Sequence, residues 1–183
     1  MRGLAASRVM VLIVLLRGAN LGKRRFSPKA VVEALADLEA VNIGAAGTFV
    51  VRKRVGERPL RARIAAELPW DNPPMVILGG KEVRDVIATG GKVDVPAGAR
   101  RFALALPKAP PKTPALPLVA MAKDGKWGMR YEALVGRVVI GVRRRFDETG
   151  AYSTRELDEA VGSDEGTMRD WPTWEKIGSA LGP

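Results

Sequence analysis

The sequence predicts an α+β protein made of two small layered halves. Three observations carry this prediction: a long apolar run near the start, an alternation of strand-like and helix-like patterns through residues 1–90, and a Gly- and Pro-containing stretch that follows them. The chain has 183 residues, of which 46% are hydrophobic and 27% are charged, and this is enough apolar material to bury a core without disulfides.

The apolar run Val9–Leu16 is the element around which we expect the first half to form. Eight continuous apolar residues rich in Val, Ile and Leu, closed by the Gly-containing stretch 17–22, indicate a central strand buried on both faces. Ser27 and Pro28 then predict the start of an amphipathic helix. The polar loop 17–25 therefore follows the carboxyl end of a buried strand, where open α/β sheets place ligands.

Two further strand and helix pairs complete the first half. Pro69 ends the first of these helices, whose apolar residues recur every four positions. The resulting N-terminal subdomain, residues 1–90, has the predicted order βαβαβα, with strands at 48–51 and 75–78 and helices at 56–68 and 80–88.

Residues 91–99 are predicted to join the halves, and residues 100–183 form a C-terminal α+β subdomain. Its Asp-Gly pair at 124–125 indicates a hairpin with a type I′ turn, and the spacing of Ser153 and Glu156 is that of a helix capping box. The expected elements are strands at 102–106, 118–122, 127–131 and 138–142, an extended proline-rich loop at 107–117, and an acidic helical tail at 147–183 whose last helix begins near Asp170.

The composition excludes several kinds of site. The chain has no Cys and no His, so thiolate chemistry, disulfides and His ligands are impossible, and we expect neither a metal site nor a cofactor. The apolar run is too short to cross a bilayer and no cleavage site for a signal peptide follows it, which favours a cytoplasmic location without membrane association.

The net charge of +10 is distributed unevenly along the chain. Residues 1–146 carry 27 basic and 11 acidic side chains, whereas residues 147–183 carry 3 basic and 9 acidic ones, giving +16 and −6. The acidic segment can fold onto the basic body or stand apart from it, and the sequence leaves both arrangements open.

Two segments resemble a known bacterial family. The stretch Leu15-Leu16-Arg17-Gly18-Ala19-Asn20-Leu21-Gly22 resembles the opening signature of domain of unknown function 1697, and Thr167–Lys176 resembles its closing motif. The family's Gln-Ser-Gly-Asn stretch corresponds here to Ala45–Thr48, which departs from it at three positions. The resemblance implies two α+β subdomains of ferredoxin-like type and implies no activity.

The loop after the first strand supplies the first candidates for anion binding. Its basic residues and Asn20 lie between glycines and a helix start, an arrangement that favours carboxylate or phosphate, although neither a P-loop nor a dinucleotide fingerprint is present. The closing motif adds two basic residues, Arg169 and Lys176. The anion-binding candidates are Arg17, Asn20, Lys23, Arg24, Arg25, Arg169 and Lys176.

Further basic clusters suggest a surface that follows phosphates. The candidates are Arg52, Arg54, Arg143, Arg144 and Arg145. Few aromatic side chains lie beside them, so reading of bases is poorly supported. For all of these residues the alternative is structural: ion pairs, turn formation or a solvated surface.

The leading hypothesis is binding of an anionic partner, either nucleic acid or a phosphorylated small molecule. The first alternative is an enzyme whose pocket holds a substrate anion between Arg17 and Arg169, with Tyr131 or a carboxylate moving protons. The second is a protein-interaction module that uses the loop 107–117.

Overall fold

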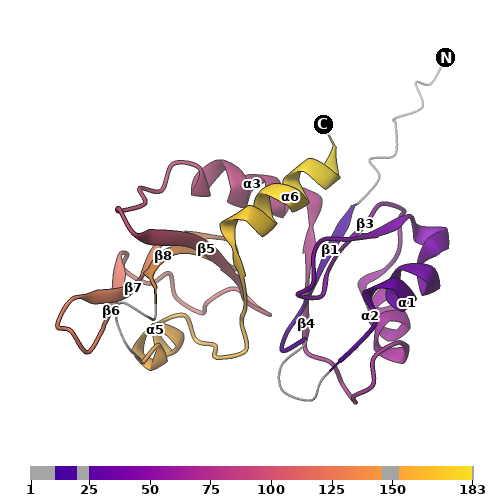
Figure 1. The fold of residues 1–183 in the computed structure, drawn as a ribbon, viewed down its shortest axis with the longest axis horizontal. Helices are drawn as coiled ribbons and strands as arrows, with labels where there is room; N and C mark the ends of the chain where they lie inside the picture. Colours follow the sequence, from indigo (N-terminus) through magenta and orange to yellow (C-terminus); the bar gives the residue numbers. More distant parts are fainter. Residues whose placement is uncertain (1–10, 20–24, 146–152, 183) are drawn as a thin grey trace.

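A computed structural model describes residues 11–19, 25–145 and 153–182 (Figure 1). These residues form two antiparallel sheets, with strand orders β2-β3-β1-β4 and β6-β7-β8-β5-β9. The predicted α+β class is confirmed, with helices packed on both sheets.

The first sheet is arranged around β1 (Leu12–Leu16), whose five residues are all buried. Strand β1 lies between β3 (Thr48–Val51) and β4 (Met75–Gly79), which confirms the predicted central strand. The short strand β2 (Ala40–Asn42) adds to the edge beyond β3. It was not predicted because it has only three residues, one of them buried, and this is too short for an alternation of apolar and polar side chains to be recognised.

Two helices cover the outer face of this sheet. Helix α1 (Pro28–Ala34) begins as predicted, because the Ser27 hydroxyl accepts a hydrogen bond from the backbone N–H of Ala30. A single 3₁₀ turn, η1 (Ala36–Leu38), leads from α1 to β2. Helix α2 (Glu57–Ala66) buries Leu60 and Ile64 against the same face.

The second sheet contains β5 (Ala99–Ala105), β6 (Leu118–Met121), β7 (Trp127–Val135), β8 (Val138–Arg144) and β9 (Thr167–Asp170). Strand β9 was not predicted, because its alternating Thr-Met-Arg-Asp residues include no run of apolar side chains. Helix α5 (Arg155–Ala160) buries Leu157 against one face of this sheet.

The two sheets share a central core. Helices α3 (Gly80–Gly90) and α6 (Trp171–Leu181) lie between them, so that α1 and α2 form one outer layer and α5 the other (Figure 1). One apolar cluster contains residues from both sheets and from both central helices: Ile13, Leu15, Val50, Val76, Leu78, Val83, Val86, Ala103, Ala105, Val138, Ile140, Trp171, Trp174, Ile177 and Leu181. The acidic C-terminal region therefore folds onto the basic body.

The turn between β6 and β7 differs from the predicted type I′. The backbone N–H of Gly125 donates to Ala122 O, and Gly125 has φ of +75° while Asp124 is not in the positive-φ region. A type I′ turn needs positive φ at both central residues. The hairpin instead uses a tight turn over Lys123 and Asp124, followed by Gly125 in the left-handed conformation.

The outward backbone groups of edge strand β4 are bonded to side chains. The carbonyl of Met75 accepts from Arg61, and the carbonyl of Ile77 accepts from Arg137, which arrives from the turn between β7 and β8. Glu82 accepts from the N–H of Gly79 and also pairs with Arg137 at 3.1 Å. These contacts close an edge that would otherwise be open to strand addition.

None of the helices in the described ranges has the length and apolar character that spanning a bilayer requires.

Substitutions of Trp174 test how much the packing of the central helical layer contributes to stability. Its ring is fully buried in the shared core, and its indole Nε1 has no hydrogen-bond partner. Trp174→Ala is expected to lower the free energy of unfolding by about 3–5 kcal/mol, because it leaves a large cavity. Trp174→Phe, which fills most of that volume and removes the unpaired N–H, is expected to cost about 1 kcal/mol. Urea denaturation measures both, and equal losses would contradict the packing described.

Candidate functional site

Arg169 on β9 is the centre of a buried polar network. It is 8% exposed, and it is buried together with Thr48 and Thr167, the other buried polar side chains of the described residues. Its Nε donates to Thr48 Oγ1 at 2.9 Å, and one terminal nitrogen donates to Thr167 Oγ1 at 3.3 Å. The network therefore joins β9 of the second sheet to β3 of the first.

The rest of the guanidinium binds backbone carbonyls. One terminal nitrogen donates to Met168 O at 2.8 Å, and the other donates to Leu16 O at 2.8 Å and to Ala46 O. All five N–H groups of the side chain thus have an acceptor. Arg169 fixes the end of β1 and the loop before β3 against β9.

The acceptors around Arg169 are all neutral. Burial lowers the pKa of Arg169 to about 10, so the guanidinium stays charged at neutral pH. No carboxylate among the described residues forms an ion pair with it. Within the part of the chain that the structure describes, the positive charge at this junction is thus not balanced by a carboxylate.

Arg17 lies next to this network. It directly follows Leu16, whose carbonyl binds Arg169, and its backbone N–H donates to Pro74 O at 2.8 Å. Its guanidinium donates to the backbone carbonyl of Asp164 at 2.7 Å rather than to a carboxylate. The structure therefore brings the two predicted arginines from opposite ends of the chain to one junction.

The same junction includes the stretch Ala45–Thr48. Ala46 and Gly47 supply carbonyls, and Thr48 supplies its hydroxyl, to Arg169. Gly47 has φ of +69°, and a Cβ there would lie 2.8 Å from that of Leu16, so a side chain at this position does not fit. The carbonyls of Ala46 and Gly47 do not depend on the side chains of this stretch, whereas the contact at position 48 needs the Thr48 hydroxyl.

A cavity of about 750 Å³ adjoins Arg17. Asp164, whose carbonyl binds Arg17, contributes to its wall together with residues of α5 and its flanks, including Thr154 and Asp158. Asp158 accepts hydrogen bonds from Thr154 Oγ1 at 2.9 Å and from Tyr131 Oη at 3.4 Å. The cavity therefore presents hydroxyl groups, carboxylates and Arg155, which is paired with Glu159, and Arg17 reaches its wall through the carbonyl of Asp164.

The structure describes two of the remaining anion-binding candidates, Arg25 and Lys176. Asn20, Lys23 and Arg24 lie outside the described residues. Arg25 is exposed just before α1, and Lys176 is exposed on α6. Within the described ranges, no group of three or more acidic side chains is arranged to hold a metal ion.

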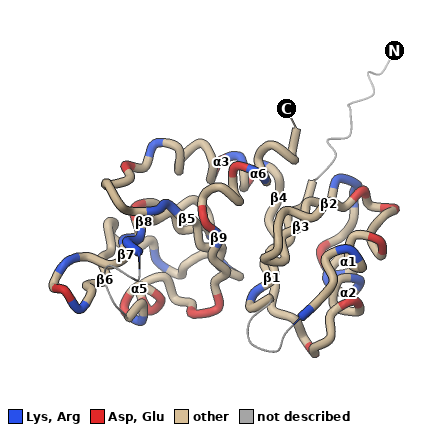
Figure 2. The backbone as a smooth tube through the Cα atoms, in the orientation of Figure 1, with Lys and Arg blue, Asp and Glu red and all other residues tan. Residues whose placement is uncertain are grey.

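The basic surface candidates lie at two separate strand ends. Arg52 and Arg54 follow β3, and Arg52 donates to Ala180 O at 3.2 Å. At the end of β8, Arg143 pairs with Asp170 and Arg144 pairs with Asp124, each at 2.8 Å. Arg145 is exposed at the end of the same strand. Figure 2 shows acidic residues interspersed with the basic ones across both subdomains.

Thr48 and Thr167 were not selected as candidates from the sequence. Both are buried hydroxyl residues at the ends of strands, and both act through Arg169. Their positions could have drawn attention to them, because Thr167 is the first residue of the segment Thr167–Lys176 and Thr48 is the last residue of the stretch Ala45–Thr48.

The fold is that of a two-sheet α+β protein with a helical layer between the sheets. The chain is similar in structure to the conserved bacterial protein SP0830 from Streptococcus pneumoniae, with a TM-score of 0.55 and 13% sequence identity, over 94% of this chain and 99% of that one. This likeness shows the fold. No family model matches the sequence, and no curated protein matches it.

Arg169 can be tested as the connection between the sheets. Arg169→Met leaves several buried oxygens without a donor and is expected to lower the free energy of unfolding by about 3 kcal/mol. The matched Arg52→Met, which removes one exposed bond to Ala180 O, is expected to cost less than about 0.5 kcal/mol. Urea denaturation measures both, and similar losses would refute the connecting role.

The cost of Arg169→Met is also expected to be independent of pH below about pH 9. The pKa of Arg169 is about 10 in the folded chain and higher in the unfolded chain, where the side chain is solvated, so below pH 9 both states hold the proton. Between these two values the unfolded chain binds more protons, and the stability contributed by Arg169 rises with pH. A dependence between pH 6 and 9 would show that another group titrates at this junction.

Proposed function

We propose that the protein binds an anionic partner carrying phosphate at the junction of its two sheets, through Arg17. The observation that carries this proposal is that Arg17 directly follows Leu16, whose carbonyl binds Arg169, and that the acceptors of both guanidinium groups in the described residues are neutral oxygens. Uncompensated positive charge at a partly buried position attracts anions strongly, because solvent screens it poorly.

The two arginines have different parts in this proposal. Arg169 has every N–H engaged, so it supplies charge and holds the junction in place. Arg17 is only half-buried, and a single carbonyl contact engages its guanidinium. Exchange of that contact for a phosphate oxygen leaves a bidentate geometry available to Arg17.

A phosphorylated small molecule is favoured over nucleic acid. A surface that follows a polyanion needs several exposed cations in one continuous array. Here Arg143 and Arg144 are already paired with carboxylates, and the cluster at Arg52 lies at a different strand end. The basic surface candidates therefore do not form one continuous array of free cations.

One observation favours a catalytic role as the second candidate. Tyr131 donates to Asp158, which contributes to the wall of the cavity beside Arg17. A hydroxyl and a carboxylate in contact can transfer a proton to or from a molecule that Arg17 holds. In that case Arg17 binds the substrate anion, and the pair at Tyr131 performs acid–base chemistry.

We further infer that the chain belongs to the family of domain of unknown function 1697, with a cytoplasmic location. The two resembling segments are neighbours in space, since Leu16 O binds Arg169. The first sheet supports a ferredoxin-like assignment, because its strand–helix–strand–strand–helix–strand order is that of the split βαβ motif. The second sheet has a different order.

Thermal shift with inorganic phosphate, pyrophosphate and ATP tests the function. A ligand at about 100 times its Kd is expected to raise the Tm by about 5 °C. Arg17→Gln should abolish this rise, and Arg17→Lys should weaken binding about tenfold, because Lys lacks the fork geometry. Arg84→Gln, on the exposed face of α3, removes the same charge and should change nothing.

Retention on heparin and on a short DNA duplex separates the two kinds of anion. Early elution together with a Tm rise assigns the function to a small molecule at Arg17. Late elution with a steep salt dependence, unaffected by Arg17→Gln, would assign it to a polyanion surface and overturn the junction site.

A further inference from the structure

We propose that edge strand β6 is a docking site for an extended acidic segment of another protein, which adds a strand to the second sheet. Strand β6 ends the strand order of this sheet, so it pairs with β7 on one side, and no strand of the described residues pairs with the other. An open edge offers backbone donors and acceptors to an incoming strand.

Two apolar side chains mark this edge. Val119 is 40% exposed and Met121 is 58% exposed, and they are the exposed large hydrophobic side chains of the described residues. Because they are two positions apart on a strand, they share a face, while Ala120 between them is buried on the opposite face. A strand added to β6 would place its alternate side chains beside Val119 and Met121.

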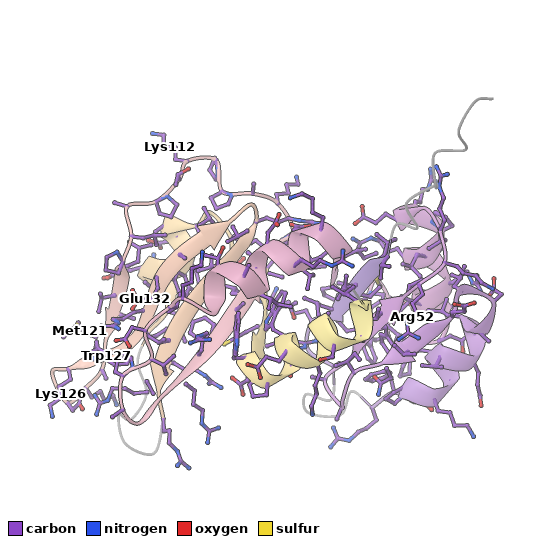
Figure 3. The ribbon with its side chains drawn as sticks, turned by 90° about the horizontal axis from the view of Figure 1, so that it is seen from above. Arg52, Lys112, Met121, Lys126, Trp127 and Glu132 are labelled. Carbon is purple, nitrogen blue, oxygen red and sulfur yellow. The ribbon has the colours of Figure 1, made fainter. Side chains whose placement is uncertain are left out.

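The neighbouring strand provides a firm support for that face. Val119 is opposite Arg130 in the register of β6 and β7. The Arg130 guanidinium stacks over the Trp127 ring at 4.6 Å, and its Nε lies 2.7 Å from a carboxylate oxygen of Glu132. Met121, Trp127 and Glu132 lie at the same end of the molecule, away from Arg52 (Figure 3).

Lysines flank the apolar pair on both sides. Lys108 and Lys112 precede β6 in the proline-rich loop, and Lys123 and Lys126 follow it in the turn. All four are exposed, and none forms an ion pair with a carboxylate of the described residues. Asp124, the acidic residue of the turn, is already paired with Arg144. The edge is therefore apolar in the middle and positive at both ends.

This charge pattern selects the partner. A complementary strand carries two apolar residues in alternate positions with Asp or Glu on either side. A second copy of this chain fits poorly, because two-fold antiparallel pairing of β6 with itself places the lysines before one strand beside the lysines after the other. Like charges in that position oppose association.

The direct test uses a fluorescein-labelled peptide, Glu-Glu-Thr-Val-Thr-Ile-Thr-Glu-Asp, and fluorescence anisotropy with the full chain. Lys123→Glu with Lys126→Glu is expected to weaken binding about tenfold. Lys29→Glu with Lys92→Glu changes the net charge equally at sites away from β6 and should alter binding less than about twofold. A peptide with Lys in place of its acidic residues should not bind.

Hydrogen exchange then locates the contact. The peptide is expected to protect the β6 backbone amides, and Met121→Asp should abolish both binding and protection. Equal effects of the two lysine pairs, or an absence of protection at β6, would overturn the proposal. So would a dimer of the chain that Met121→Asp dissociates, since the edge would then belong to a second copy. Arg17→Gln should leave peptide binding unchanged, which separates this proposal from the anion site.

Discussion

The contacts of one guanidinium group set the relation between the two halves of this protein. Arg169 satisfies its N–H groups with oxygens from the end of β1, from the loop before β3 and from β9, three segments that are distant in the sequence. Moving one sheet away from the other would leave a buried charge without hydrogen bonds, which is costly in an apolar interior. Apolar packing of α3 and α6 holds the sheets together, and the hydrogen bonds of Arg169 fix the position of one sheet relative to the other.

Much of the fold follows from patterns that a single sequence displays. The buried run at β1, the Ser-Pro start of α1 and the Trp-containing face of α6 are strong local signals, and each formed as predicted. The short strands β2 and β9 depend on their neighbours instead. Strand β9 carries Arg169, whose burial makes sense only beside oxygens that other segments supply.

The candidate site was predictable in its residues but not in their roles. Arg17 was selected because it follows the apolar run of β1, and Arg169 because its segment resembles the closing motif of a known family. Their partners are mostly backbone carbonyls, which every residue type possesses and no pattern identifies. The pairing of Arg143 with Asp170 was equally hidden, because it depends on the order β8-β5-β9 within the sheet.

The position of α6 has a consequence for how the protein forms during synthesis. This helix supplies Trp171, Trp174, Ile177 and Leu181 to the layer between the sheets, yet every strand that it covers precedes it in the chain. The inner faces of both sheets therefore emerge from the ribosome before the helix that shields them. A nascent chain paused before residue 171 exposes apolar strands in both halves, and it is at this stage that chaperones have most to protect.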